Sequence, residues 1–177
     1  MVSGNETPVL TRWPSRPDTG IAMPPTRMPV LDRDAESRLA AGLYNDVWRL
    51  MELPKRRPEQ DDEMLHATHA SRYHWGRVGE PVKLARGEWL CSRVYAILRR
   101  PEPSLWHAHR CLELLTDFGG GENWDEAAVY EALARAYSVA GDRGESRRWI
   151  AKARQALKSV PSEDDRKTIE ADLKTIK

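Results

Sequence analysis

The 177-residue sequence is poor in several features that would place it in a familiar class. It has only two cysteines, Cys91 and Cys111, whereas a disulfide-stabilised secreted domain would carry more, so we expect a reducing cytoplasm. No apolar run approaches the roughly 18 residues of a membrane span, and we expect no secretory signal because the N-terminus lacks an apolar segment. With a formal net charge of +1, no overall field favours nucleic acid or a membrane surface.

Catalytic and cofactor motifs are also absent from the sequence. There is no P-loop, dinucleotide-binding fingerprint, nucleophile elbow or compact metal motif such as CxxC or HExxH. We therefore expect a protein that is not an enzyme and has no cofactor. An enzyme would need a convergent group of side chains, and the alternative set is His74, Glu88, Arg93 and Tyr95.

Proline, by contrast, is abundant at the start of the chain. Six of the twelve prolines lie in residues 1–33, together with many Gly, Ser, Thr and Asn residues. Such a segment cannot bury enough apolar surface to offset its ordering entropy, which predicts a flexible N-terminal arm. The alternative is an arm that docks on the rest of the protein through Trp13 and the apolar residues 21–23.

From residue 34 onward, apolar residues recur with helical periodicity and the prediction is all-α. Proline and glycine separate about seven helices. Their expected ranges are 34–52, 61–78, 82–99, 104–117, a pair that begins near residue 124 and breaks at residues 141–142, and 162–176. Asp34 is the expected N-cap of the first helix.

Residues 130–153 carry the most regular pattern in the chain. Large and small residues alternate so that two helices can pack closely around a Gly-Asp turn. The positions are Tyr130, Leu133, Ala134 and Tyr137, then Gly141, and then Ser146, Ile150 and Ala153. This spacing resembles the tetratricopeptide repeat.

The resemblance is clear over residues 86–161 and implies a right-handed stack of helices. It divides the chain into a degenerate pair (34–79), a repeat (82–117), a second repeat (124–160) and a capping helix (162–176). Arg99 stands where the family has the turn glycine, so we expect that turn to differ in shape.

In this family, peptide ligands lie on a concave surface formed by the first helix of each repeat. The resemblance therefore implies that a partner contacts Arg86, Trp89, Arg93, Glu131 and Arg135. Two guanidinium groups, from Arg93 and Arg135, suit a carboxylate of the partner. On this reading, alanine at both positions would weaken partner binding without unfolding the domain. The alternative is that both arginines pair internally with Glu88 and Glu131.

The histidines offer a second candidate site. His66 and His69 share one face of a helix, and His107 and Cys111 share a face of another, so facing helices could assemble a metal site. The alternative is that Cys111 is a buried core residue. His74 is expected to be a hydrogen-bonded core histidine.

The function that the sequence predicts is protein–protein interaction, with an unidentified protein or peptide held in a concave groove. The alternatives are a small-molecule or metal-binding helical protein, and a self-associating regulatory protein that forms a homo-oligomer through Trp-rich surfaces or the arm. The arm could also occupy the groove of its own chain. The short basic clusters are balanced by nearby acids, so no nucleic-acid partner is expected.

Overall fold

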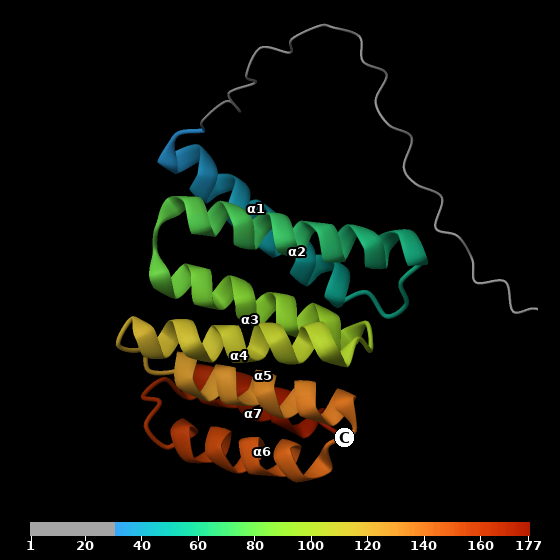
Figure 1. Ribbon diagram of the computed structural model, residues 1–177, viewed down its shortest axis with the longest axis vertical. Helices are drawn as coiled ribbons and strands as arrows, with labels where there is room; N and C mark the ends of the chain where they lie inside the picture. The colour runs from blue at the N-terminus through green and yellow to red at the C-terminus, as the bar shows by residue number, and fades with distance from the viewer. Residues whose placement is uncertain (1–30) are drawn as a thin grey trace, which may run out of the picture. The chain divides into compact units, whose positions relative to one another are not determined.

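The structure, a computed structural model, describes residues 31–177, and in this range it has seven α-helices and no strand (Figure 1). The helices are α1 (Arg33–Met51), α2 (Pro58–Val78), α3 (Pro81–Ile97), α4 (Pro101–Asp117), α5 (Asp125–Ala140), α6 (Arg143–Leu157) and α7 (Glu163–Lys174). The predicted all-α class with seven helices is therefore confirmed for this part of the chain. The expected arm, apart from residues 31–33, lies outside the described residues.

The predicted N-cap of the first helix is wrong by two residues, and two predicted helix starts are wrong by three residues. The N-cap of α1 is Asp32, whose carboxylate accepts a hydrogen bond from the Ala35 N–H at 2.7 Å, while Asp34 lies in the first turn. Helices α2 and α4 begin at Pro58 and Pro101, because a proline has no N–H to leave unpaired and its fixed φ suits the first helical turn.

The turn after α3 does not have the different shape that Arg99 was expected to cause. Arg99 adopts a left-handed φ of 57°, in the same region as the φ of 84° at Gly141. The hydrogen bonds correspond as well. The N–H groups of Arg99 and Arg100 donate to the carbonyl oxygens of Ala96 and Tyr95, and those of Gly141 and Asp142 donate to the equivalent carbonyl oxygens at the end of α5. Both helices thus end in the Schellman pattern, with one hydrogen bond between residues five apart and one between residues three apart.

Helices that are adjacent in the sequence pack against each other from α1 to α7. In addition, α3 contacts α5, and α5 contacts α7, so the odd-numbered helices from α3 onward form a second set of contacts. Trp89 on α3 packs against all four clusters of buried apolar residues, which makes it the central side chain of the core.

Helices α2 and α3 approach closely at Gly87. A Cβ atom at this position would lie 3.2 Å from the Cα atom of Arg72, so a larger residue would push the two backbones apart. This close approach brings the side chains of α2 onto those of α3. Across residues 31–177, each helix is too short or too polar to cross a membrane.

Candidate functional site

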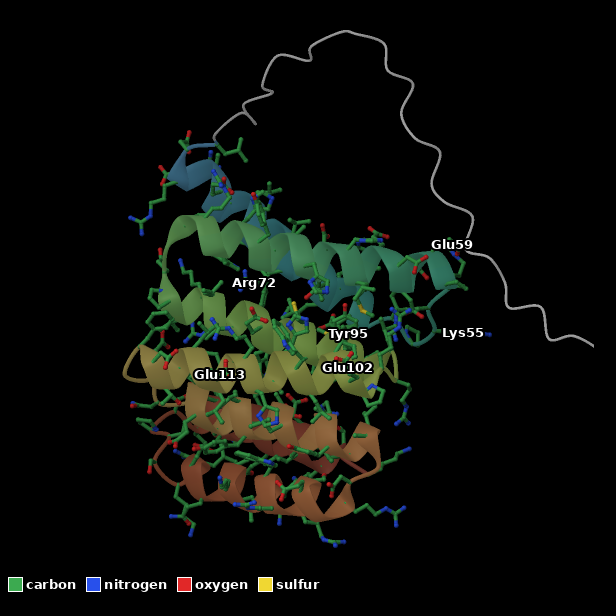
Figure 2. All side chains as sticks on the ribbon, in the orientation of Figure 1. Lys55, Glu59, Arg72, Tyr95, Glu102 and Glu113 are labelled. Atoms are coloured by element: carbon green, nitrogen blue, oxygen red, sulfur yellow. The ribbon has the colours of Figure 1, made fainter. Side chains whose placement is uncertain are left out.

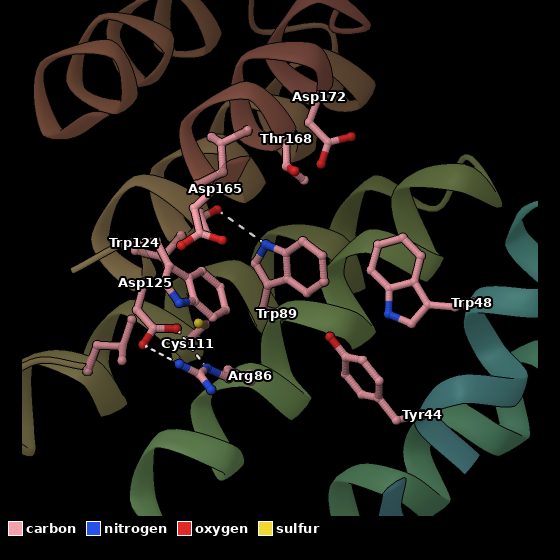
Figure 3. A pocket seen from close by; sticks show the side chains of 14 residues that line it. Tyr44, Trp48, Arg86, Trp89, Cys111, Trp124, Asp125, Asp165, Thr168 and Asp172 are labelled. Carbon is pink, nitrogen blue, oxygen red and sulfur yellow. Dashed lines mark hydrogen bonds and ion pairs between the residues drawn. The ribbon is translucent and has the colours of Figure 1, made fainter. Parts of the chain in front are cut away.

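A pocket of about 210 Å³ is lined by residues of α1, α3, α4, α5 and α7, together with Trp124 just before α5 (Figure 3). Its walls are mostly apolar. The aromatic residues that line it are Tyr44, Trp48, Trp89 and Trp124, and the charged residues are Arg86, Asp125, Asp165 and Asp172. Since small-molecule sites usually measure about 300 Å³ or more, this volume suits one side chain of a partner better than a large cofactor.

Trp89 forms the floor of the pocket and is held in one orientation. Its Nε1–H donates to the carbonyl oxygen of Ala128 on α5 at 3.2 Å. Trp48 on α1 stacks on Trp89, with ring centroids 5.9 Å apart and ring planes at 29°. The ring centroid of Tyr44 lies 6.4 Å from that of Trp48. The pocket therefore has a fixed aromatic wall that extends from α1 to α5.

Arg86 is paired within the protein and does not offer a free charge to the pocket. Its guanidinium donates two hydrogen bonds of 2.9 Å to Asp125, lies 3.2 Å from Glu122 and sits 4.3 Å from the centre of the Trp124 ring. Burial alone would lower the pKa of Arg86, but Asp125 and Glu122 raise it above its usual value. Arg86 consequently stays charged and fixes the start of α5 against α3.

Asp165 on α7 is the pocket carboxylate with no internal counter-ion. It is half-buried, and it forms no ion pair with any residue in the range 31–177. Asp125 is paired with Arg86 and Asp172 with Arg93. Asp165 is therefore the charge of the lining that remains uncompensated among residues 31–177, and it favours a cation.

The predicted partner-binding arginines lie in an internal network with Glu131 (α5) and Asp172 (α7). Arg93 contacts Glu131 Oε1 at 3.3 Å and also donates to Asp172 Oδ1. Arg135 donates from Nε to Glu131 Oε1 at 2.8 Å and from Nη2 to the backbone oxygen of Asp172 at 2.9 Å. Arg93 and Arg135 therefore pair internally with Glu131, as the alternative interpretation of the sequence expected. Glu88, the other expected partner, bonds to Arg72 and His107 instead.

Glu131 makes this network important for stability. It is 1% exposed, and among residues 31–177 its Oε2 atom has no hydrogen-bond partner. Burial raises its pKa, and the charges of Arg135 and Arg93 oppose that rise. Alanine at both arginines would leave a buried carboxyl group without compensation, so we no longer expect that pair of substitutions to leave the fold intact.

Of the five predicted partner-binding residues, Arg86 and Trp89 line the pocket. Arg135 lines a separate hollow with the last residues of the chain, and Arg93 and Glu131 lie in the network between α3, α5 and α7. Sequence reasoning missed Tyr44, Trp48, Trp124 and Asp165 as pocket residues. The two aromatics of α1 had a visible signal, because they flank its apolar stripe instead of lying within it.

The histidines are arranged differently from the predicted pairs. His69 on α2 and His107 on α4 come together, and the third member of their cluster is Cys91 on α3. Cys111 is a buried residue that lines the aromatic pocket, and His66 is exposed.

The residues considered for an enzyme do not converge. His74 hydrogen-bonds through Nδ1 to Glu36 at 2.5 Å, as expected for a core histidine, and Arg93 pairs with Glu131 and Asp172. Only Glu88 and Tyr95 lie near a common histidine, His107.

Comparison of the chain with protein-family models, with curated proteins and with solved structures finds no match. Its function must therefore be inferred from the geometry of its own residues.

Proposed function

We propose that this protein is an interaction module that binds a peptide or helix of a partner protein, and that the pocket between α1, α3, α5 and α7 receives a lysine or arginine side chain of that partner. The observation that carries the proposal is an aromatic pocket of side-chain size with an unpaired carboxylate, Asp165, at its α7 wall. It is not a carboxylate-binding site of the kind expected from the sequence, because Arg93 and Arg135 already have partners.

The chemistry of the lining favours a cationic, partly apolar side chain. The faces of tryptophan rings attract ammonium and guanidinium groups with about 0.5–2 kcal/mol, and their apolar stems pack on the same rings. A carboxylate that accepts a charge-assisted hydrogen bond adds about 1.5–3 kcal/mol. Trp48 and Trp89 offer the rings and Asp165 the carboxylate. The guanidinium of Arg93 already lies 5.8 Å from the centre of the Trp89 ring.

The tetratricopeptide-like organisation belongs to the same proposal. It is supported by the pairing of α1 with α2, α3 with α4 and α5 with α6, and by contacts of α3 with α5 and of α5 with α7. In this reading, the binding surface is the side formed by the odd-numbered helices, and α7 caps the stack and completes the pocket. A second hollow, which shares Tyr44, Arg86 and Trp124 with the first, extends the surface between α1 and α3.

The proposal is tested with peptides selected from a random displayed library on the immobilised full chain. We expect the selected peptides to share a lysine or arginine flanked by apolar residues. Isothermal titration calorimetry should then show that Asp165→Asn weakens these peptides by about tenfold, which corresponds to ~1.4 kcal/mol.

Matched controls separate the pocket from general surface effects. Asp164→Asn removes the neighbouring exposed carboxylate of α7, and Trp106→Ala removes a tryptophan of α4 that is 56% exposed. Both variants should bind the peptides as the parent chain does. Selection of acidic peptides, absence of any selection, or equal affinities for the Asp165→Asn and parent chains would each contradict the proposal.

A further inference from the structure

Three consecutive helices each contribute one metal-binding side chain to a single point in the protein. His69 lies on α2, Cys91 on α3 and His107 on α4, and one potential ligand atom of each lies within 4.8 Å of the other two. Figure 2 labels two neighbours of this cluster, Arg72 and Tyr95. The cluster shares no residue with the aromatic pocket, because none of its three members lines that pocket.

His107 is oriented as metal-binding histidines commonly are. Its Nδ1 lies 2.6 Å from Glu88 Oε2, and the other oxygen of Glu88 accepts a hydrogen bond of 2.6 Å from Arg72 Nε. The carboxylate of Glu88 accepts at both of its oxygens, from Arg72 at Oε1 and from His107 at Oε2. Nδ1 of His107 must therefore carry the proton, and Nε2 is the nitrogen left to bind a cation.

His69 reaches the cluster from α2. Its Nε2 lies 2.8 Å from the hydroxyl group of Tyr95, and its ring centroid lies 5.4 Å from that of His107. The phenol O–H can donate to the lone pair of Nε2. A metal ion at this nitrogen would take the place of that hydrogen bond, with the phenol oxygen beside it.

Cys91 is a buried thiol. It is 0% exposed, and the hydroxyl group of Thr68 donates to its Sγ over 4.0 Å. A bound divalent cation displaces the proton of a cysteine thiol and takes the thiolate as a ligand.

We propose that His69, Cys91 and His107 form a binding site for a divalent transition-metal ion, with zinc as the preferred occupant. Two imidazole nitrogens and one thiolate suit zinc and exclude magnesium and calcium, which require oxygen ligands. The nearby carboxylate, Glu88, is already engaged by His107 and Arg72. The ion would join α2, α3 and α4 through one ligand each, and a water would complete a tetrahedral set.

The test uses the full chain without an affinity tag, reduced and freed of metal with a chelator. Titration with cobalt(II) should give one equivalent of binding and a near-ultraviolet absorption band from thiolate-to-cobalt charge transfer. Zinc should then displace the cobalt and abolish the band. Zinc binding in weakly buffered solution should also release about one proton per ion, from the thiol.

Cys111→Ser is the matched control because Cys111 is the other buried cysteine and lies four residues from His107. We expect the band to persist in Cys111→Ser and to be lost in Cys91→Ser, with zinc affinity lowered at least about 100-fold. His69→Ala changes a half-buried position, so it provides a second ligand variant if Cys91→Ser does not fold.

Failure of the parent chain to bind cobalt and zinc would overturn the proposal, and so would a charge-transfer band that requires Cys111 in place of Cys91. Asp165→Asn should leave cobalt binding unchanged, so the metal site and the peptide pocket can fail independently.

Discussion

At the scale of single residues, Glu131 is the side chain whose environment is most demanding. Its one bonded oxygen is shared by Arg93 and Arg135, and its other oxygen has no partner among residues 31–177. An ionised carboxylate in such a place is tolerated only while its counter-charges remain, since desolvation costs several kcal/mol per ion. The two arginines are therefore expected to stabilise the fold more than they assist binding.

Replacing Arg93 and Arg135 together by alanine should lower the free energy of unfolding by about 3–5 kcal/mol at pH 7, measured by urea denaturation with tryptophan fluorescence. Adding Glu131→Gln should restore part of this loss because the buried group is then neutral. Arg148→Ala, which removes an exposed arginine of α6, should leave stability nearly unchanged. Parent-like stability of the double variant would show that Glu131 needs no counter-charge.

The stability lost in the Arg93→Ala/Arg135→Ala double variant should increase with pH. Burial raises the pKa of Glu131 above 4.5, and removal of both guanidiniums raises it further. A carboxyl group with a raised pKa in the folded state stabilises the fold at low pH, and this contribution is lost as pH increases through the folded value. The double variant should therefore be closer to the parent in stability at pH 5 than at pH 8.

Residue types that could form a site can be identified from the sequence. Which of these residues lie close together in the folded chain cannot be predicted from it. Spacing within one helix predicts that His107 and Cys111 share a face, yet Cys91 is the cysteine near His107. Which residue of a neighbouring helix lies opposite depends on the register between helices. Here that register follows from close contacts such as the one at Gly87, which a periodicity argument does not supply.

At the scale of helices, Glu36 connects the first turn of α1 with the last turns of α2. Its Oε2 lies 2.5 Å from His74 Nδ1, and its Oε1 accepts a hydrogen bond of 2.6 Å from Arg77. These hydrogen bonds, first that of His74 and then that of Arg77, lower the pKa of Glu36. The contribution of this contact to stability is present above pH 4.5 and is lost as pH falls through the lowered value.

Glu36→Gln should therefore lower the melting temperature at pH 7 and reduce its dependence on pH between about pH 5 and pH 3. Asp46→Asn is the control on the same helix, since Asp46 pairs with Arg49 in an exposed contact that contributes little. Melting curves followed by circular dichroism over this pH range give the comparison. If the acid sensitivity of Glu36→Gln equals that of the parent, another carboxylate must control it.

Helical periodicity was sufficient to predict every helix, whereas the starts at Pro58 and Pro101 were missed. A proline interrupts the interior of a helix but is favoured in the first turn, so the same residue can indicate a linker or a start. The choice depends on whether the preceding chain can cap the helix. Before α2, the side chain of Gln60 accepts a hydrogen bond from the N–H of Arg57 and provides part of that cap.

At the scale of the whole described domain, α7 both covers the core and completes the pocket. Ile169 and Leu173 are 7% and 6% exposed and pack on a cluster from α5 and α6. From the same helix, Asp165, Thr168 and Asp172 line the pocket. Stability and the proposed peptide binding would thus be coupled through one helix.

A chain that ends at Pro161 should lose about 3–6 kcal/mol of stability from the exposure of these two side chains alone. It should also lose affinity for the selected peptides, because it lacks Asp165. Lys167→Ala on the exposed face of α7 is the control and should change neither property. Denaturation and calorimetry of both chains provide the readouts, and parent-like peptide affinity in the truncated chain would place the binding site elsewhere.

The contact between Arg93 and Asp172 joins residues that are 79 positions apart, whereas α3 is joined to α4, and α5 to α6, by a tight turn. Contacts between neighbours in sequence form quickly, while the closure of a long loop carries a larger entropic cost. We expect the helical pairs to assemble first during refolding and α7 to dock last. Under the proposed function, the capacity to bind the selected peptides would then return after the helical signal has recovered, and its return would mark the final step of folding.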